Sequence, residues 1–318
     1  MGAWSRSRAV LTATAAAAVV GGSVVLAACG GGGDDDDSAP QAGATARVTT
    51  LARQAFGPNP RATSGRIDGR IEITLKGARG YEEPVRLAMS GPFRSRAGSA
   101  LPDYAVDLSV GNQGIGLSSA GGRSFASLGD AGYALPREVR RRLARSAAKG
   151  RNGLTRMLEQ FGIAPWRWET NKRIAGSERI DGVQTVRVAT GVAVDRFLRD
   201  ANTLGGVLGA IGVARANGLP ARIPRAARAV LVDSVRSANG ASWIATSDKV
   251  MRKAGLTIDF VIPRGRRAAL SGISAVKVKA EVLVSEVGRP QTIGAPRTLA
   301  PFSSLKLAFD ALAEKAAR

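Results

Sequence analysis

A period-two alternation of apolar and polar residues recurs along most of this chain and constrains its fold more than any other feature. In the segment 66–76, Ile67, Ile71, Ile73 and Leu75 share one parity, and charged or polar residues occupy the other. Because successive side chains of a strand point to opposite faces, the segment predicts a half-buried antiparallel strand. The same pattern, with Gly, Pro and Asn between the runs, predicts a meander that continues through residues 85–89, 104–110, 115–117 and 125–128.

Helices are expected to interrupt this meander. Pro136 suits a first helical turn, and residues 137–149 and 154–161 read as two helices, of which the first is densely basic. Residues 165–168 are expected to return the chain to a strand. Asp181-Gly182 then predicts a type I′ hairpin turn, because this dipeptide accepts positive φ angles, and the second arm of the hairpin continues to Val194.

The segment 195–238 predicts a pair of helices. An apolar stripe at helical spacing, Leu204, Val207, Leu208 and Ile211, is interspersed with glycines that each cost a helix about 1 kcal/mol, so the first helix should be loosely held. The second helix starts near Pro224 and carries Arg225, Arg228 and Arg236. Two interpretations stand: an amphipathic pair that covers a sheet face, or a mobile lid with an arginine rim suited to lipid headgroups.

Three further strands, at 243–245, 256–262 and 276–284, and a terminal helix at 304–317 complete the pattern. Strands, then helices, then strands predict one α+β domain over residues 51–318, in which an antiparallel sheet of about ten strands curves over helices. The tetrapeptide Arg-Ile-Asp-Gly occurs at 66–69 and again at 179–182. Its flanking sequences diverge, so the repeat is interpreted as a coincidence.

The N-terminus has the parts of a lipoprotein leader. Arg6 and Arg8 precede an apolar run at 9–26, and Leu26-Ala27-Ala28-Cys29 has the form of a lipobox. We expect residues 1–28 to be a signal peptide and Cys29 to be acylated, with chains such as palmitate, at the extracytoplasmic face of the cell membrane. The alternatives are an ordinary signal peptide with an incidental cysteine, and an uncleaved anchor helix.

A polar segment follows Cys29. Four glycines at 30–33 and four aspartates at 34–37 begin a stretch that lacks the apolar residues needed for a core. We expect residues 29–50 to be the lipidated cysteine and a flexible tether. A calcium site at the aspartate run is the less favoured interpretation, because adjacent carboxylates without a defined loop usually form a solvated spacer.

Charge and composition narrow the function. The chain carries a formal charge of +21, and most of its 46 basic residues are arginine. A tethered extracytoplasmic domain of this charge would meet anionic lipid headgroups or wall polymers, and nucleic acid is not expected as a partner. A codon usage that favours arginine explains the positive charge as well as an anionic binding partner does.

The inventory of catalytic residues is small. The chain has no histidine, and its one cysteine is assigned to the lipid, so Ser-His-Asp and Cys-His catalysis, disulfides and histidine-ligated zinc are excluded. A two-carboxylate glycosidase remains conceivable, but no spacing favours it. We therefore expect neither an enzyme nor a metal or cofactor.

Several segments resemble one known family. Asp181-Gly182-Val183-Gln184-Thr185, the helix opening at Val194-Asp195-Arg196-Phe197-Leu198, Trp243-Ile244, the strand from Met251-Arg252 to Phe260, and Val287-Gly288-Arg289-Pro290 follow one another as in the LppX/LprAFG envelope lipoproteins of actinobacteria. The resemblance covers residues 51–305, and none of its motifs is stringent. More distantly, the chain is similar to the LolA/LolB and RseB half-barrels.

The resemblance implies a strongly curved antiparallel sheet, or half-barrel, packed on helices around an apolar cavity, and a role as carrier or chaperone of acylated lipids or glycolipids. Only 15 aromatic residues are available to fill such a space. The competing hypothesis is a tethered interaction or regulatory protein with a solid core and a basic surface. Under the first hypothesis the expected cavity lining is Ile71, Ile73, Leu87, Val106, Leu108, Leu204, Leu208, Ile211, Trp243, Ile258, Phe260, Val278 and Val282.

Overall fold

The computed structural model describes residues 38–59, 61–78, 82–95, 101–110, 113–146, 152–210, 222–305 and 307–309. The predicted signal peptide, the acylation site at Cys29 and the first part of the tether lie outside these residues, as does Ile211.

Twelve strands among the described residues form one sheet, in the order β12-β6-β5-β4-β3-β2-β1-β11-β10-β9-β8-β7. Neighbouring strands are antiparallel, except that β12 runs parallel to β6. The strands are β1 (Ser64–Lys76), β2 (Val85–Arg94), β3 (Asp103–Val110), β4 (Gln113–Ala120), β5 (Arg123–Leu128), β6 (Ala131–Ala134), β7 (Glu169–Ile180), β8 (Val183–Val192), β9 (Val235–Ala245), β10 (Met251–Val261), β11 (Ala275–Ser285) and β12 (Leu299–Ala300).

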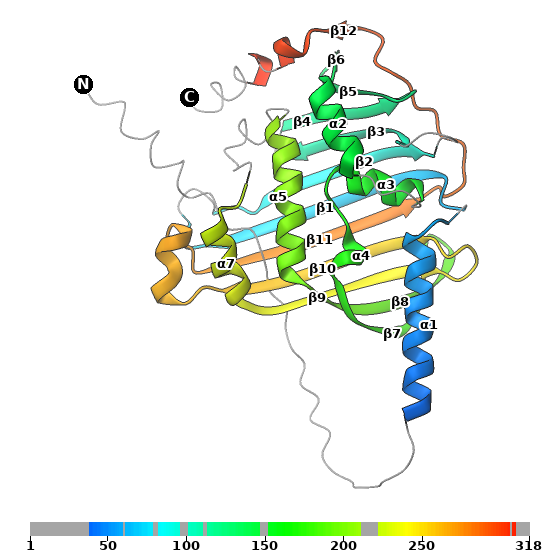
Figure 1. Cartoon of the computed structure of the whole chain (residues 1–318), viewed down its shortest axis with the longest axis vertical. Coiled ribbons are helices and arrows are strands. Elements are labelled where there is room, and N and C mark those ends of the chain that lie inside the picture. The colour runs from blue at the N-terminus through cyan, green and yellow to red at the C-terminus, as the bar shows by residue number, and fades with distance from the viewer. Residues whose placement is uncertain are drawn as a thin grey trace.

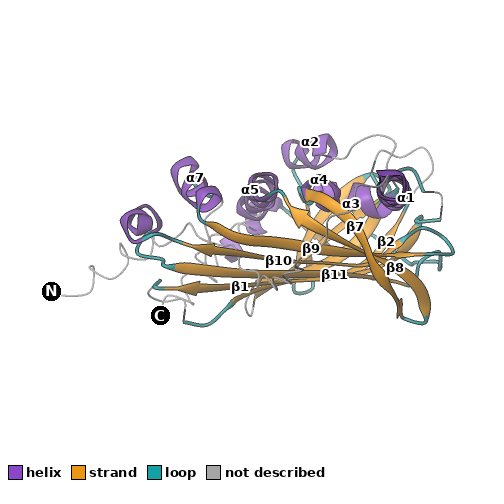
Figure 2. Ribbon diagram, turned by 90° about the horizontal axis from the view of Figure 1, so that it is seen from below, coloured by secondary structure: helices purple, strands orange, loops and turns teal. Residues whose placement is uncertain are grey.

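Helices cover one face of this sheet. Figure 2 shows α1, α2, α3, α4, α5 and α7 on the same side, above a sheet that bends toward them at one end. The helices are α1 (Ser38–Phe56), α2 (Arg137–Ser146), α3 (Gly153–Gln160), α4 (Pro165–Trp168), α5 (Val194–Ala210) and α7 (Arg225–Asp233), together with the short 3₁₀ helix η2 (Arg264–Leu270). The predicted α+β class, with a curved antiparallel sheet packed on helices, is confirmed.

The predicted meander is present as β1 to β5, and β6 extends it. The predicted hairpin turn is also confirmed, because Asp181 and Gly182 have φ angles of 48° and 77° between the paired residues Ile180 and Val183. The second Asp-Gly pair, Asp68-Gly69, lies within β1 and pairs with Leu283 and Val282. The repeated tetrapeptide thus occupies a strand in one place and the end of a strand and a turn in the other.

Two local predictions are wrong. Residues 165–168 form the short helix α4, because Pro165 occupies its first position and the strand begins only at Glu169. The helix that begins after Pro224 ends at Asp233, so Val235 and Arg236, predicted to be helical, open β9 instead.

The expected tether is shorter than the sequence suggests. Residues 38–50, predicted to be flexible, belong to α1, which continues to Phe56. Val48, Ala55 and Phe56 of this helix are buried in the core, and Leu51 packs against them. A helix that is marginal alone is therefore stabilised by packing of its C-terminal half.

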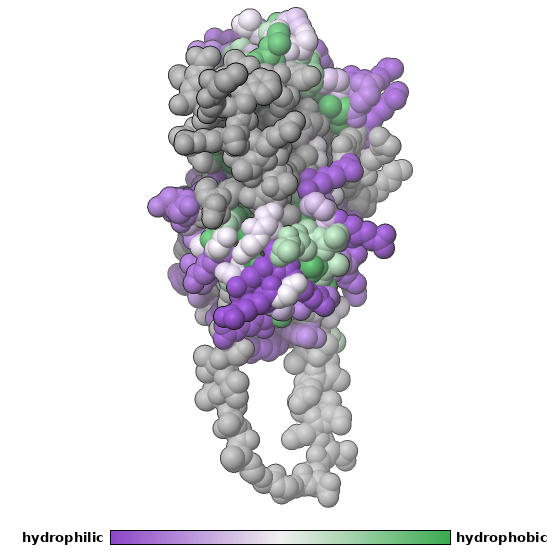
Figure 3. Space-filling view, turned by 90° about the vertical axis from the view of Figure 1, so that its left-hand side faces the viewer, coloured by the Kyte–Doolittle hydropathy of each residue, from purple (hydrophilic) through white to green (hydrophobic). Residues whose placement is uncertain are grey.

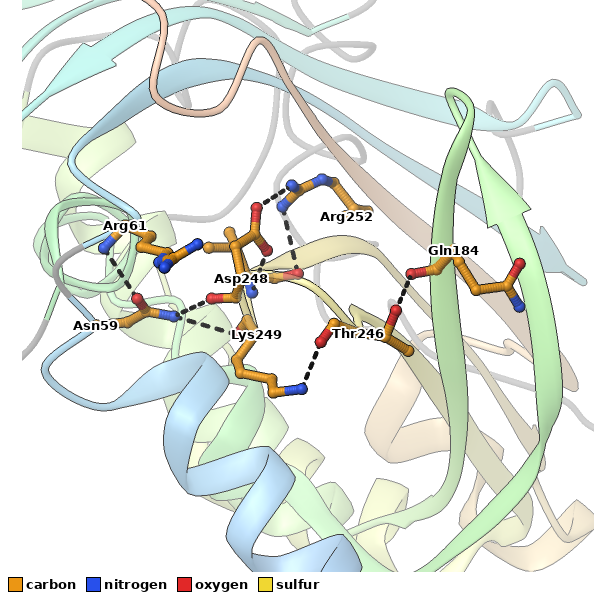
Figure 4. A network of polar contacts seen from close by, with 8 residues as sticks. Asn59, Arg61, Gln184, Thr246, Asp248, Lys249 and Arg252 are labelled. Carbon is orange, nitrogen blue, oxygen red and sulfur yellow. Dashed lines mark hydrogen bonds and ion pairs between the residues drawn. The ribbon is translucent and has the colours of Figure 1, made fainter.

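A polar network fixes the end of α1 to the rest of the fold (Figure 4). The side-chain amide of Asn59 donates hydrogen bonds to the carbonyl oxygens of Asp248 and Lys249, at 3.0 and 3.2 Å. Arg252 forms an ion pair with Asp248, and the backbone amide of Thr246 donates to the carbonyl of Gln184 at 3.0 Å. The β9–β10 turn is thereby joined both to the segment after α1 and to β8.

Within the described part of the chain, the buried apolar side chains form two clusters. One contains Tyr104, Val106, Phe161 and Leu208, between β2–β5 and the helices α1, α3 and α5. The other contains Phe197, Leu231, Ile258 and Phe260, beneath α7 and the start of α5. The space between these clusters is where the candidate site lies.

Candidate functional site

An apolar cavity of about 290 Å³ lies between the middle of the sheet and the helices. Its floor is formed by β1, β2, β3, β8, β9, β10 and β11, and its roof by α3, α4 and α5 (Figure 1). This volume is just below the roughly 300–1,000 Å³ typical of small-molecule pockets. Along with the strand residues, the aromatic side chains of Phe161, Trp168 and Phe197 contribute to the lining.

Small residues on the floor leave this space open. On the helix-facing side of adjacent strands, Ala280 pairs with both Ile71 and Leu256, and Leu256 pairs with Gly240. In the next row, Val282 pairs with Gly69 and Ala254. Across each of these rows, glycine or alanine alternates with a larger residue, so the side chains of the sheet do not fill the space below the helices. The two flanking clusters, in contrast, are filled by large side chains.

Gly69 illustrates the available room. A Cβ atom built on it would have its nearest heavy atoms at 3.7 Å, in Met89 and Val282, which is ordinary van der Waals contact. Its backbone φ does not fall in the left-handed region that favours glycine. The glycine is therefore not required by the backbone there, and its effect is to enlarge the cavity.

Helix α5 supplies the roof with Leu204, Gly205 and Leu208. The glycine-rich stripe that the sequence identifies thus lies over the cavity, where a missing side chain adds volume. At the start of the helix, Phe197 packs edge-on against Trp168, with 5.1 Å between the ring centroids. This contact joins α4 to α5 and closes one wall.

Two carboxylates interrupt the apolar lining. Asp200 accepts hydrogen bonds from the Trp168 indole at 2.8 Å and from the Ala164 amide at 3.1 Å. Glu169 accepts a hydrogen bond from the Ser242 hydroxyl at 2.8 Å, and Lys172 lies 3.4 Å from its second oxygen. Burial raises the pKa of both carboxyls, and these hydrogen bonds oppose the rise.

Most of the residues predicted to line a cavity are brought together here. Eight of the thirteen contribute to the lining: Ile71, Ile73, Leu87, Leu108, Leu204, Leu208, Val278 and Val282. They come from five elements that are distant in sequence, namely β1, β2, β3, α5 and β11. Ile211 lies outside the described residues.

Four predicted lining residues lie elsewhere. Val106, Ile258 and Phe260 face the helices as expected, but they are buried in the flanking clusters, with 1%, 0% and 0% of their surfaces exposed. Trp243 is not in the lining; its ring contacts Arg187 and Lys253, which pair with it across β8 and β10. Its neighbour Ile244 is the residue that enters the core.

Sequence reasoning missed a second group of lining residues. Some continue the alternation that it used, and others come from turns and helix starts that carry no periodic signal. The additional apolar residues include Leu75, Val85, Met89, Val110, Phe161, Ile163, Trp168, Val192, Phe197, Ile223, Ala254, Leu256 and Ala280. The parity of Leu75, Met89, Val110 and Leu256 would have been sufficient to find those four.

Neither a metal centre nor a spanning helix is found in the part of the chain that the structure describes. No group of three or more acidic or cysteine side chains there could hold a metal ion. None of the described helices is long and apolar enough to cross a membrane.

No family model matches the sequence, and no curated protein matches it. Solved structures similar to this one include the lipoprotein LppX of Mycobacterium tuberculosis, with 14% identity and a TM-score of 0.39 over 81% of this chain and 100% of that chain. LprF from Mycobacterium bovis has 11% identity and a TM-score of 0.36 over 79% of this chain and 97% of that chain. A LolA superfamily protein from Nitrosomonas europaea has 9% identity and a TM-score of 0.23, over 78% and 94%. These are the families that the sequence resembles, and the likeness concerns the fold.

Proposed function

We propose that this chain is a membrane-anchored extracytoplasmic lipoprotein that binds an acylated lipid or glycolipid in the apolar cavity and acts as a lipid carrier or chaperone of the cell envelope. The observation that carries the proposal is a cavity of about 290 Å³ between sheet and helices, lined mainly by aliphatic and aromatic side chains. A protein with a solid core, the competing hypothesis, would have filled this space. The proposed role is binding rather than catalysis.

The energetics favour an acyl chain as the ligand. Each methylene transferred from water into an apolar site contributes about 0.8 kcal/mol, so roughly ten buried methylenes contribute about 8 kcal/mol before the cost of association is subtracted. The volume suits one chain better than several. We therefore place one acyl chain of the lipid under α5, with the remainder of the molecule outside the cavity.

Acylation of Cys29 would hold the carrier at its membrane. Two or three acyl chains anchor a protein stably, whereas one chain does so only marginally. Residues 30–37 lie between Cys29 and the start of α1 at Ser38, and α1 enters the core at Val48. At no more than about 3.5 Å per residue for residues 30–37 and about 1.5 Å per helical residue up to Val48, the core lies at most about 43 Å from Cys29. Loading and delivery would thus take place close to the anchoring membrane.

A calorimetric titration tests the binding step. The chain from residue 29, with Cys29→Ser to prevent acylation, is delipidated and titrated with decanol, a neutral ten-carbon ligand. We expect saturable binding with a negative heat-capacity change, which is the mark of apolar burial. Ala280→Phe, which places a ring in the cavity, should weaken binding by about tenfold or more.

The matched control is Lys279→Phe. Lys279 is the exposed neighbour of Ala280 on β11. Lys279→Phe therefore adds the same ring to the opposite face of the same strand. It should bind decanol as the unmodified protein does. Absence of saturable binding, or equal losses in the two variants, would contradict the assignment of this cavity as the lipid site.

A further inference from the structure

We propose that the end of the molecule formed by α7 and η2 docks on an anionic phospholipid bilayer. This surface, called here the α7–η2 end, comprises the outer faces of α7 and η2. The inference goes beyond the cavity, since it concerns the outer surface and assigns it a partner. Its failure would leave the proposed lipid binding unaffected.

An apolar stripe is exposed on α7. Ala227 and Leu231 point into the core, and Ala226, Ala229 and Val232 occupy the opposite, exposed side of the helix at spacings of three residues. The backbone of β10 reaches the end of α7 here, because the Val261 amide donates a hydrogen bond to the carbonyl of Ser234 at 3.0 Å, while the Val261 side chain lies on the other face of the strand from Phe260. Val232 is among the exposed large apolar residues, at 37%.

Arginines surround this stripe. Arg222, Arg225 and Arg264 are exposed at the same end of the molecule. The nearby acidic side chains already face other cations: Asp233 pairs with Arg266, Asp195 pairs with Arg199 and Arg228, and the Asp259 carboxylate on β10 interacts with Lys277 and Arg236. Among the described residues, no ion pair engages Arg225 or Arg264. Figure 3 looks at this side of the molecule and shows strongly hydrophilic side chains next to hydrophobic ones.

The surface is held rigidly. Leu231 and Leu270 anchor α7 and η2 in the core, with 0% and 1% exposed. Arg267 Nε donates to the carbonyl of Ile262 at 3.2 Å, and the amide of Gly272 donates to the carbonyl of Arg267 at 2.8 Å. The arginines are thus presented on ordered elements, so little backbone entropy is lost on binding.

Exposed apolar residues with arginines beside them are complementary to an anionic bilayer, which offers negative headgroups and an apolar interior. Arginine attracts the headgroups, contributing about 1 kcal/mol per residue near the surface, and the apolar stripe enters the boundary between headgroups and acyl chains. The same end adjoins the cavity, because Ile223 lines the cavity and lies two residues before α7 begins at Arg225. Ile73 and Leu75, also in the lining, pack against the cluster that contains Leu231. Docking here would bring the bilayer next to a wall of the cavity.

The test is sedimentation with lipid vesicles. The chain from residue 29 with Cys29→Ser has no acyl anchor. It contains all of the described residues that form the sheet and its helices, which lie between 38 and 309. We expect it to bind vesicles of phosphatidylglycerol and phosphatidylcholine, to bind phosphatidylcholine alone far more weakly, and to dissociate as salt rises from about 0.1 to about 1 M. Arg225→Gln combined with Arg264→Gln should reduce the partition coefficient about 25-fold, or about fivefold per arginine.

A matched control removes the same charge elsewhere. Arg179 and Arg289 are exposed residues near the opposite end of the strands, so Arg179→Gln with Arg289→Gln lowers the net charge equally. We expect this variant to bind vesicles nearly as well as the unmodified chain. Val232→Glu should also weaken binding if the apolar stripe enters the bilayer.

Three results would overturn the proposal. Equal losses in the two double variants would show that the overall charge, and not this surface, attracts the membrane. Undiminished binding to phosphatidylcholine alone would show that anionic headgroups are not recognised. Retention on an anionic wall polymer that depends on Arg225 and Arg264, without vesicle binding, would assign the surface to the polymer. Unchanged thermal unfolding and unchanged decanol binding in each variant exclude loss of the fold as the cause.

Discussion

The indole Nε1 of Trp168 donates a hydrogen bond of 2.8 Å to Oδ2 of Asp200, and this bond joins α4 to α5 at the wall of the cavity. The Ala164 amide donates to the same oxygen at 3.1 Å. The carboxylate therefore has a structural role, as the acceptor that holds the short helix α4 against α5. It also places a polar group in a lining that is mainly apolar.

Replacing Asp200 should loosen this wall. Asp200→Ala leaves the Trp168 and Ala164 donors without their acceptor, which should lower the free energy of unfolding by about 1–3 kcal/mol. Asp200→Asn keeps one carbonyl acceptor and should cost less. Urea denaturation followed by tryptophan fluorescence measures both; an alanine variant as stable as the unmodified chain would show that the bond contributes nothing.

Enlarging Gly69 should separate stability from binding. A leucine at this position extends into the cavity, since a Cβ there meets only ordinary contacts. Because glycine within a strand is destabilising by roughly 0.5–1 kcal/mol, Gly69→Leu should fold at least as stably as the original while binding decanol more weakly. A Tm from calorimetry together with a titration checks this expectation. A lower Tm with intact binding would mean that the side chain is directed elsewhere.

The sequence predicts which face of the sheet a side chain occupies better than it predicts whether that side chain is buried in the core or lines the cavity. The alternation in β1 places Ile71 and Ile73 on the helix-facing side, as observed, and the same rule correctly turns Ile258 and Phe260 of β10 that way. Parity, however, carries no information on which helix lies above a position. Ile258 and Phe260 pack against residues of α7, α5 and η2 and are fully buried, whereas Ile71 lines the cavity.

Other features of the site depend on non-local packing. The small residues Ala254, Gly240 and Ala280 create the hollow only because they become neighbours across β9, β10 and β11. The alternation assigns Trp243 to the wrong face because its run is short and the adjacent Ile244 is equally apolar. Sequence reasoning misses the helix at 38–50 because its composition is polar and its stabilising contacts, such as that of Val48, are with distant residues.

Asn152 should be a sensitive position for stability. Its side chain caps α3 by accepting from the Thr155 amide at 2.9 Å, and it donates to the carbonyls of Ala55 and Gly57 at 3.0 and 3.1 Å. Asn152→Ala removes the cap and the side-chain donor to the buried Ala55 carbonyl, while the Gly57 carbonyl keeps the backbone amides of residues 59 and 152 as donors, so we expect a loss of about 2–3 kcal/mol. Chemical denaturation measures the loss. The matched control is Asn239→Ala, which removes an exposed asparagine of β9 and should have little effect; similar losses in the two variants would contradict the role assigned to the cap.

Stability should depend on pH through Glu169. Burial raises the pKa of this carboxyl above its ordinary value of 4.5, so the folded chain binds the proton more tightly than the unfolded chain. The resulting destabilisation is absent well below pH 4.5 and develops as pH rises through the raised pKa. Glu169→Gln removes the ionisation, so its stability relative to the original should increase with pH across this window. Denaturation at a series of pH values would contradict the account if the difference between the two proteins stayed constant.

The most direct test of the account is mass spectrometry of lipids that co-purify with the protein from its native envelope. The Cys29→Ser chain, exported and purified without detergent, should carry acylated lipid in a stoichiometric amount. Ala280→Phe should lose that lipid, and Lys279→Phe should retain it, with all three proteins equally folded. Purification of the unmodified cavity without lipid, or equal lipid in the Ala280→Phe variant, would contradict the claim that this cavity holds an acyl chain.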